Sequence, residues 1–318
     1  MIFFSNKTHL IYNNSFNEPI ENLPKTLTHL SLGFCFNQLV DNLPNGLIYL
    51  KFSINFNQSV DNLPQSLTHL IFGRKFNQLV DNLPKNLTHL TFGYSFNQPV
   101  DNLPKNLTHL TFSWSFNKLV DNLPENLTYL TFGYSFNQSV DNLPKNLTHI
   151  IFGKKFNQPV NNLPKNLTQL KLNKNFNQSV NNLPQNITHL YFGKKFNQKV
   201  HNLPQKITHL YFGKKFNQSI DNISNTLIFL KIGNNFNNKI PINVRELYVN
   251  HNNKILNNLP NHIEKIYIKF CGYCNSFIKK NIDNLPFSIK EIIIQKEEHE
   301  DFLTKIPFET IISIQKNM

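Results

Sequence analysis

A unit of 20 residues recurs along most of this chain of 318 residues. The pair Phe-Asn returns at every twentieth residue, twelve times from Phe16 to Phe236. The triplet Asn-Leu-Pro keeps the same period in ten consecutive units, from Asn22 to Asn202. Repeats of this length are typical of solenoids, in which each unit packs only against its neighbours and one core runs through the stack. The repeat therefore predicts a single repeat domain, residues 1–318.

Two apolar spacings alternate inside each unit. Leu110 and Phe112 alternate with polar residues, which predicts a short strand whose apolar side chains face inward. The next apolar residues are spaced by four and three, as in a helix. Pro124 and the preceding Asp121-Asn122 pair disfavour a helix interior. We therefore expect turns and extended chain between the strands, with at most one tight helical turn.

One unit is too small to fold alone. Each unit offers six apolar positions, and burying one side chain contributes roughly 1.5–3 kcal/mol. Ordering the backbone and side chains costs on the order of 1.5 kcal/mol per residue. Stacked units share both their apolar surface and a ladder of backbone hydrogen bonds. We expect an all-β-dominated solenoid of about 15 rungs, with one parallel sheet on one face and few or no helices.

The array becomes irregular towards its end. Residues 8–240 hold regular units, residues 241–295 hold degenerate ones with an insertion near residues 270–280, and residues 296–318 are expected to form a C-terminal cap. Ile312 and Ile314 continue the strand pattern and suggest a sixteenth strand. No separate cap is expected before the first unit, because the pattern begins directly at Thr8.

Several residues recur at the same position of successive units, and we expect them to have structural roles. Neighbouring strands lie roughly 4.8 Å apart, a spacing at which successive Phe rings can stack. The series that begin at Asn17 and at Asn22 are expected to form ladders whose amides bond to the turn backbone. The glycines that follow most strands, such as Gly93, favour a turn with positive φ over an open backbone. The aspartates from Asp41 to Asp141 are expected to cap turns, with calcium binding as the weaker alternative.

The motif resembles a known family. Phe-Asn-Gln-X-Val-Asp-Asn-Leu-Pro-X-X-Leu-Thr-His-Leu is similar to the FNIP repeat of social amoebae and of giant viruses that infect amoebae, strongly over residues 8–240 and weakly over 241–295. The resemblance implies a leucine-rich-repeat-like solenoid with a parallel sheet on one face. Unlike a leucine-rich repeat, this unit places its ladder Asn two residues later, so the turn after the strand should differ. Family members often carry an F-box, which this sequence lacks, so no ubiquitin-ligase role is expected.

The charge is uneven. The formal net charge is +13; residues 1–150 hold nine basic and nine acidic side chains, and residues 151–318 hold 23 basic and ten acidic ones. This asymmetry can indicate an anionic partner, although a solvated basic face is the interpretation that we prefer. No apolar run is long enough for a membrane span, and no signal-peptide core is recognisable. Three cysteines in 318 residues favour a reducing, cytoplasmic location, and we expect a monomer without a cofactor.

One outward strand column is rich in histidine. It includes eight histidines between His9 and His209. A metal ladder is one interpretation, but zinc prefers ligands that converge from different directions, and these side chains should project in parallel. We prefer a stacked, hydrogen-bonded imidazole column. Its stability should fall as the pH drops through the histidine range, because adjacent rings would acquire like charges.

The position directly after the glycines varies along the array, and it carries the candidate binding residues. A run of aromatic side chains is followed by a run of lysines: Tyr94, Trp114, Tyr134, Lys154, Lys174, Lys194 and Lys214. Exposed aromatic residues are typical of protein interaction sites, and aromatic residues interleaved with cations also suit single-stranded nucleic acid. Duplication of a lysine-bearing unit would also explain the lysines.

We therefore expect a non-enzymatic scaffold that binds an unidentified protein. A module in the basic second half that binds anions or nucleic acid is the alternative. A lone Cys271-Gly272-Tyr273-Cys274 motif in the insertion could form a redox pair or half of a zinc site. No second such motif exists in the sequence, and no other residues break the repeat in a way that indicates an acid–base site.

Overall fold

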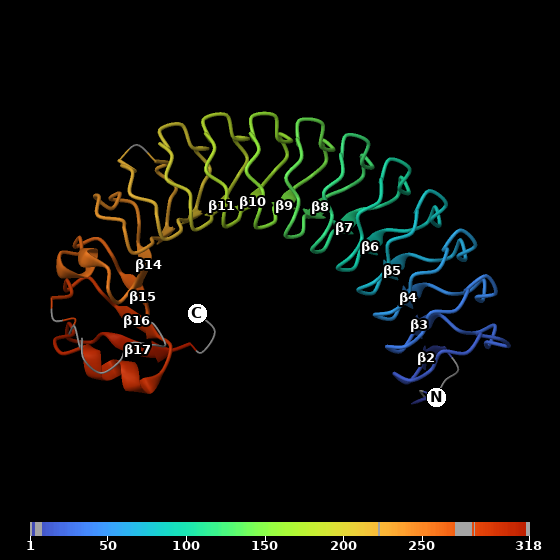
Figure 1. Ribbon diagram of the computed structural model, residues 1–318. Helices are drawn as coiled ribbons and strands as arrows, with labels where there is room; N and C mark the ends of the chain where they lie inside the picture. Colours follow the sequence, from blue (N-terminus) through green and yellow to red (C-terminus); the bar gives the residue numbers. More distant parts are fainter. Residues whose placement is uncertain (1, 4–7, 222, 271–281, 283, 316–318) are drawn as a thin grey trace. The chain divides into compact units, whose positions relative to one another are not determined.

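The computed structural model describes residues 2–3, 8–221, 223–270, 282 and 284–315 (Figure 1). The chain divides into two compact units, Met1–Leu167 (unit 1) and Thr168–Met318 (unit 2). The single repeat domain over residues 1–318 that the repeat predicts stays a prediction. Each unit is a stack of rungs, where a rung is one strand with the chain that leads to the next strand.

Unit 1 holds eight parallel strands of three residues each. Each strand pairs with the next in a register offset of 20 residues, so that His89 lies opposite His109. A short antiparallel strand, β1 (Ile2–Phe3), pairs with β2 and covers that edge of the sheet. The expectation that no cap precedes the first rung was therefore wrong. The parallel strands are β2 (His9–Ile11), β3 (His29–Ser31), β4 (Tyr49–Lys51), β5 (His69–Ile71), β6 (His89–Thr91), β7 (His109–Thr111), β8 (Tyr129–Thr131) and β9 (His149–Ile151).

Unit 2 also holds eight parallel strands, and its later rungs depart from the 20-residue period. Glu246 lies opposite Phe229 and Lys265 lies opposite Glu246. Two 3-10 helices, η1 (Lys254–Asn257) and η2 (Glu297–Phe302), lie between late strands. The strands are β10 (Gln169–Leu172), β11 (His189–Phe192), β12 (His209–Tyr211), β13 (Phe229–Lys231), β14 (Glu246–Asn250), β15 (Lys265–Lys269), β16 (Glu291–Ile294) and β17 (Ile311–Ile314).

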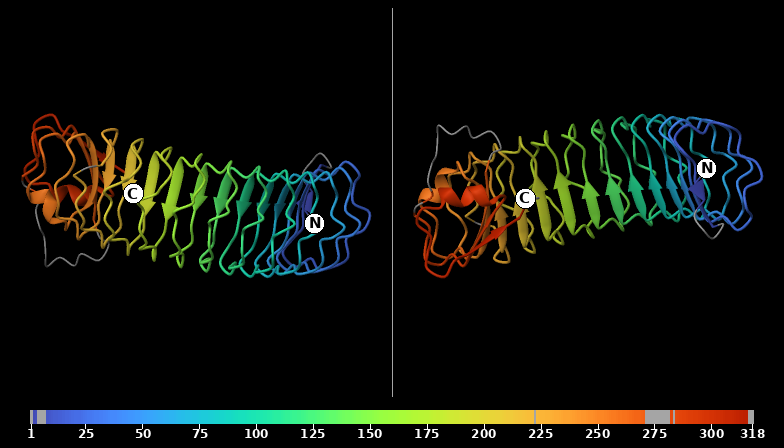
Figure 2. Two further views of the ribbon diagram at one scale, coloured as in Figure 1. Left: turned by 90° about the horizontal axis from the view of Figure 1, so that it is seen from above. Right: turned by 90° about the horizontal axis from the view of Figure 1, so that it is seen from below.

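These elements confirm the predicted solenoid with parallel strands and about 15 rungs. Apart from β1, the strands of each unit run side by side in one direction (Figure 2), and no α-helix occurs in the part of the chain that the structure describes. The sixteenth strand suggested by Ile312 and Ile314 is β17, which pairs with β16. It lies within residues 296–318, so the segment expected to be a cap also continues the sheet.

The core is built from apolar columns that run from rung to rung. Leu110 and Phe112 are each 1% exposed, as the alternation predicted, and Phe116 is fully buried. The Phe116 ring stacks on Phe112 at 3.7 Å and on Phe96 and Phe136, one rung away on either side, at 6.1 Å between centroids. Phe columns of this kind supply much of the buried apolar area that a single rung lacks.

The rungs lie closer together on the strand side than at this Phe column. The imidazole centroids of His89 and His109 are 4.2 Å apart, whereas the rings of Phe96 and Phe116 are 6.1 Å apart. Unit 2 shows the same difference, with 4.4 Å in its histidine column and 5.9 Å in its Phe column. Within each unit, therefore, the sheet lies on the inner side of a local bend (Figure 1).

Asparagine ladders tie the turns of successive rungs together. The backbone N–H of Asn117 donates to Oδ1 of Asn97 at 2.9 Å, and the N–H of Asn137 donates to Asn117 in turn. This confirms the role predicted for the first Asn series. The second series differs, because Nδ2 of Asn122 donates to Oδ1 of Asp101 in the preceding rung. The aspartates therefore join rungs through these amides, and the expectation that they cap turns missed this role.

The glycine column reflects close approach between rungs. A Cβ atom on Gly93 would lie 1.7 Å from the carbonyl oxygen of Gly73, and one on Gly133 would lie 1.5 Å from that of Ser113. No glycine among the described residues has a positive φ. The expectation of a positive-φ turn was therefore wrong. Glycine occupies this position because the backbone of the preceding rung fills the space that a side chain needs.

Candidate binding surface

The candidate binding residues lie in the turn that directly follows each strand. This turn continues the hydrogen-bond ladder between rungs, because the N–H of Ser115 donates to the carbonyl oxygen of Tyr94 at 3.0 Å and the N–H of Ser135 donates to that of Trp114 at 2.9 Å. The ladder holds side chains of successive rungs at a fixed offset. A row of side chains at this position therefore forms a strip with a defined geometry.

Three aromatic side chains of unit 1 form a continuous stack, which we call the aromatic ribbon (Tyr94, Trp114 and Tyr134). Tyr94 and Trp114 lie 5.2 Å apart between ring centroids with an interplanar angle of 14°. Trp114 and Tyr134 lie 4.0 Å apart at 4°. Tyr94 is 37% exposed and Trp114 is 41% exposed, so the ribbon is accessible although its rings pack on one another.

Cations flank both ends of the aromatic ribbon. The Arg74 guanidinium carbon lies 4.7 Å from the ring centroid of Tyr94. At the other end, Nζ of Lys154 and Nζ of Lys155 each lie 5.7 Å from the ring centroid of Tyr134. These are distances at which a cation is attracted to the face of an aromatic ring. The ring faces are therefore engaged along the ribbon, and its outward contacts are made by ring edges.

Ring edges have a chemistry of their own. The edge of an aromatic ring carries partial positive charge, and the Tyr hydroxyl and Trp indole N–H are hydrogen-bond donors. Together with Arg74, Lys154 and Lys155, this makes a strip that favours carbonyl and carboxylate groups. A nucleic-acid base, in contrast, stacks on an open ring face.

The remaining predicted residues lie in unit 2. Lys174, Lys194 and Lys214 follow β10, β11 and β12 and are exposed. Their turns are held by the same ladder, because the N–H of Lys195 donates to the carbonyl oxygen of Lys174 at 3.0 Å. The structure thus brings together the first four of the seven predicted residues in unit 1, and the other three form a row of their own in unit 2. Sequence reasoning missed the contact of Arg74, although its position one repeat before Tyr94 could have indicated it.

The histidine column lies on the outward face of the strands. His9 and His29 stack at 4.1 Å between centroids, and His69, His89 and His109 continue the stack at 4.3 and 4.2 Å. Tyr129 extends the column, 4.5 Å from His109. The adjacent histidines thus stack as expected, whereas Tyr49 interrupts the column and lies tilted at 34° to His69, 6.4 Å away between centroids.

Each histidine is oriented by the threonine that precedes it. Oγ1 of Thr108 lies 2.9 Å from Nδ1 of His109 and donates its own hydrogen to the carbonyl oxygen of Thr88 at 3.1 Å. Because the hydroxyl has a single hydrogen, Nδ1 of His109 must be the donor in their contact. Nε2 is then the acceptor and points outward. The same pair of contacts recurs at Thr28, Thr68, Thr88, Thr148, Thr188 and Thr208.

The environment favours neutral imidazoles. Burial lowers the pKa of His89 below its usual value, and the neighbouring His109 and His69 lower it further. Burial, followed by the charges of His9 and His69, does the same to the pKa of His29. Among the described residues, no three His, Cys, Asp or Glu side chains converge as metal ligands would. Cys271 and Cys274 lie outside the described residues, and so does any role of that motif.

Comparison with known proteins is consistent with this architecture. Nine overlapping segments match the profile of the FNIP repeat, and together they cover residues 36–235, more than half of the chain. The chain belongs to the FNIP-repeat family. The matched segments are residues 36–75, 59–95, 76–113, 96–121, 116–155, 136–162, 156–195, 179–215 and 196–235.

Two solved structures resemble this FNIP array. CroV588, a giant-virus protein described as a novel circular leucine-rich-repeat structure, is 40% identical with a TM-score of 0.79. The match covers 96% of this chain, which spans 49% of CroV588. YopM from Yersinia enterocolitica shares the fold at 19% identity and a TM-score of 0.50, over 92% of this chain and 65% of YopM. No curated protein is significantly similar in sequence.

The family and the fold establish a leucine-rich-repeat-like scaffold. Folds of this class are commonly used for protein interaction and are generally not catalytic. None of the helices in the described part of the chain has the length and apolar character that a membrane span requires.

Proposed function

We propose that this FNIP array is a non-enzymatic scaffold that binds a protein partner through the aromatic ribbon of unit 1. The observation that carries the proposal is the stack of Tyr94, Trp114 and Tyr134, which stays partly exposed although it is rich in apolar area. Trp, Tyr and Arg are the residues that most often dominate the binding energy of protein interfaces. The rigid stack also loses little conformational freedom when a partner binds.

The chemistry of the strip favours an acidic or carbonyl-rich segment of the partner. The Tyr hydroxyls and the Trp indole N–H donate hydrogen bonds, the ring edges carry partial positive charge, and Arg74 and Lys154 add positive charge at both ends. The lysine row of unit 2, Lys174, Lys194 and Lys214, would accelerate association with an acidic partner by long-range attraction. The scarcity of cysteine supports a partner in a reducing compartment such as the cytoplasm, and the chain is proposed to act as a monomer.

Nucleic-acid binding by the basic half is the competing function. It has less support at the ribbon, because rings that already stack on one another and on cations offer few open faces to a base. The two functions differ in their response to salt. Binding that depends on phosphate contacts weakens steeply as salt rises, whereas a contact made largely by packed aromatic groups weakens much less.

The proposal is tested by comparing two triple variants of the full chain. Affinity purification from the native cell identifies partners of the unmodified protein, of the variant Y94A/W114A/Y134A and of the control L39A/L79A/L119A. The control removes three leucines of unit 1 that are 60%, 58% and 60% exposed, and so deletes exposed apolar area elsewhere on the same unit. Partners lost only from the aromatic variant are then purified and their Kd is measured.

We expect the aromatic variant to weaken binding by about 30-fold or more, because truncation of a dominant interface residue costs roughly 2 kcal/mol or more. The control should bind like the unmodified protein. Equal recovery of partners by all three proteins would overturn the proposal. So would salt-sensitive binding of a single-stranded oligonucleotide that the aromatic variant loses, since that result assigns the ribbon to nucleic acid.

A further inference from the structure

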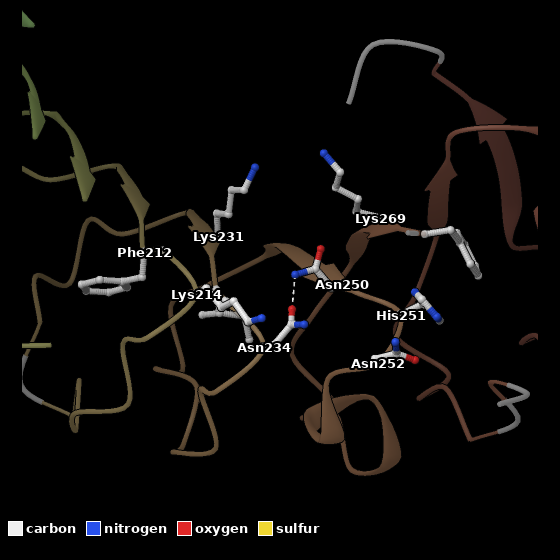
Figure 3. Close-up of a pocket in the computed structure, with 12 residues that line it drawn as sticks. Phe212, Lys214, Lys231, Asn234, Asn250, His251, Asn252 and Lys269 are labelled. Atoms are coloured by element: carbon white, nitrogen blue, oxygen red, sulfur yellow. Dashed lines mark hydrogen bonds between the residues drawn. The ribbon is translucent and has the colours of Figure 1, made fainter. Parts of the chain in front are cut away.

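A pocket of about 340 Å³ opens in unit 2 where the regular rungs give way to the irregular ones (Figure 3). It lies across the ends of β12 to β15 and the turns that follow them. The strands β14 and β15 have five residues, whereas β12 and β13 have three. The longer strands carry outward side chains beyond the point where a regular rung turns.

The register explains why a pocket forms at this place. Lys231 lies opposite Tyr248, and Asn250 lies opposite Lys269. Asn250 is two residues after Tyr248, just as Gly233 is two residues after Lys231, so Asn250 and Lys269 extend the column that glycines occupy in the regular rungs. The side chains of Asn250 and Lys269 therefore project beside Gly213 and Gly233, which have no side chain. This difference between neighbouring rungs forms one wall of the pocket.

Three lysines and three asparagines line the pocket beside the apolar Phe212, Ile232 and Phe270, and no carboxylate is found among the described lining residues. Lys214 follows β12, Lys231 ends β13, and Lys269 ends β15. In Figure 3 the side chains of Lys231 and Lys269 extend to the same open side, with Asn250 between them. The Asn250 amide donates to Oδ1 of Asn234, which fixes its orientation.

Lys231 is partly buried and lies near another cation. Its Nζ lies 3.7 Å from the ring centroid of Tyr248, a contact that favours the charged form. Burial, followed by the charge of Lys269, lowers the pKa of Lys231 to about 8. Elsewhere in unit 2, lysines pair with carboxylates, as Lys265 does with Glu291 at 2.8 Å and Lys290 with Glu264 at 2.7 Å. A partly buried cation beside a like charge is destabilising until an anion compensates it.

We propose that this pocket binds a phosphate group, supplied as free phosphate or as a small phosphomonoester. Lysine is a common phosphate ligand, and a tetrahedral dianion can accept hydrogen bonds from several ammonium and amide groups at once. Lys214, Lys231 and Lys269 reach the pocket from three different rungs, and the Asn234–Asn250 pair adds polar groups between them. The pocket and the aromatic ribbon share no residue, so this inference is independent of the proposed protein-binding function.

Binding should couple to the protonation of Lys231. A phosphate dianion favours its charged form, so affinity is expected to fall as the pH rises from about 7 to about 9. Among the described residues, the other titratable groups around it are Tyr211 on β12, Lys214, Tyr248 on β14, His251, and Tyr267 and Lys269 on β15. Burial raises the pKa values of the three tyrosines, so they stay neutral in this range. Glu246 accepts a hydrogen bond from the Tyr267 hydroxyl.

The test measures the Kd of inorganic phosphate for the full chain by ³¹P NMR titration, with potassium chloride at matched ionic strength as the reference. The variants are K231Q and K269Q, and the control is K171Q. Lys171 occupies the same strand position as Lys231 three rungs earlier. Unlike Lys231, it is exposed. A phosphomonoester such as glycerol phosphate is titrated in parallel, and tighter binding than that of inorganic phosphate identifies the ester as the natural form.

We expect saturable binding that weakens roughly tenfold or more in K231Q and in K269Q, the loss typical of one charge-assisted hydrogen bond, and that is unchanged in K171Q. Circular dichroism of each variant verifies that the fold is kept. The inference is overturned if phosphate gives no saturable response. It is also overturned if chloride competes at matched ionic strength as well as phosphate does, or if K171Q weakens binding as much as K231Q.

Discussion

Acidification should loosen the histidine column, and the sign follows from the pKa shifts. The pKa values of His29, His89, His109, His189 and His209 are lowered, with burial as the largest cause. A histidine whose folded pKa is below its unfolded value takes up a proton more readily in the unfolded chain. Its full contribution to stability is present above the unfolded pKa of about 6.5. That contribution declines as the pH falls from there through the folded pKa.

The magnitude can be worked from the ring spacing. Two unit charges about 4 Å apart repel by about 1 kcal/mol in water. Four pairs of histidines are adjacent in the column, with ring centroids 4.1–4.4 Å apart: His9–His29, His69–His89, His89–His109 and His189–His209. Full protonation would therefore cost up to about 4 kcal/mol at low salt, and less at physiological ionic strength because salt screens exposed charges.

The assay compares thermal unfolding of the full chain at about pH 7.5 and about pH 5, followed by circular dichroism at low and at high salt. The matched variant is H69Q/H89Q/H109Q, in which Gln is chosen because Gln169 naturally occupies this column on β10. The Tm of the unmodified protein should be lower at the acidic pH, more so at low salt, and the variant should lose much less.

Carboxylates do not confuse this comparison. The hydrogen bonds and charges of Lys290 and Lys265 lower the pKa values of Glu264 and Glu291 below their usual range, so their stabilising contribution is lost only at a more acidic pH. Equal Tm values for the unmodified protein at both pH values would refute the reasoning. The same conclusion would follow if the variant showed the full pH dependence.

Three further predictions concern the solenoid itself. G93A should destabilise unit 1 by about 1–3 kcal/mol through overpacking, whereas G46A, whose Cβ would be no closer than 3.5 Å to its neighbours, should be near neutral in urea unfolding. F116A removes a fully buried ring and should cost about 3–5 kcal/mol, against less than about 0.5 kcal/mol for F34A, a ring that is 47% exposed. N97A leaves the N–H of Asn117 without its acceptor and should cost about 1–3 kcal/mol; faster amide exchange at Asn117 than at Asn57 would report the defect locally.

The fold was predictable because the same pattern of apolar residues recurs in every regular unit. The alternation of Leu110 with Phe112 and the period of Phe116 determine which side chains face inward and how far apart the strands lie in sequence. Even the irregular strands near Leu247 and Ile312 could be recognised from this pattern. The role of the glycine column could not, because a single unit does not reveal that the backbone of Gly73 fills the space beside Gly93.

The candidate surfaces were predictable only in part. The row formed by Tyr94, Trp114 and Tyr134 follows from the period, since residues 20 apart must be neighbours in a stack. The engagement of their faces does not, because it depends on ring orientation. The pocket proposed to bind phosphate was missed because Lys231 and Lys269 lie in rungs whose lengths differ, so only the observed register places their side chains at the same opening.

The asparagine ladder also bears on how such an array changes length over time. The Oδ1 atom of each ladder Asn accepts a hydrogen bond from the backbone N–H of the Asn in the next rung. Any rung with the same Asn can therefore take the next place in the stack. A deletion of residues 101–120 would join Val100 to Asp121, recreating the Val-Asp junction already present at Val100 and Asp101, and Asn97 would then accept from Asn137. Unequal recombination between repeats can therefore add or remove whole rungs of unit 1 without leaving an unsatisfied bond at the junction, so rung number can drift while the surface of each rung is selected on its own.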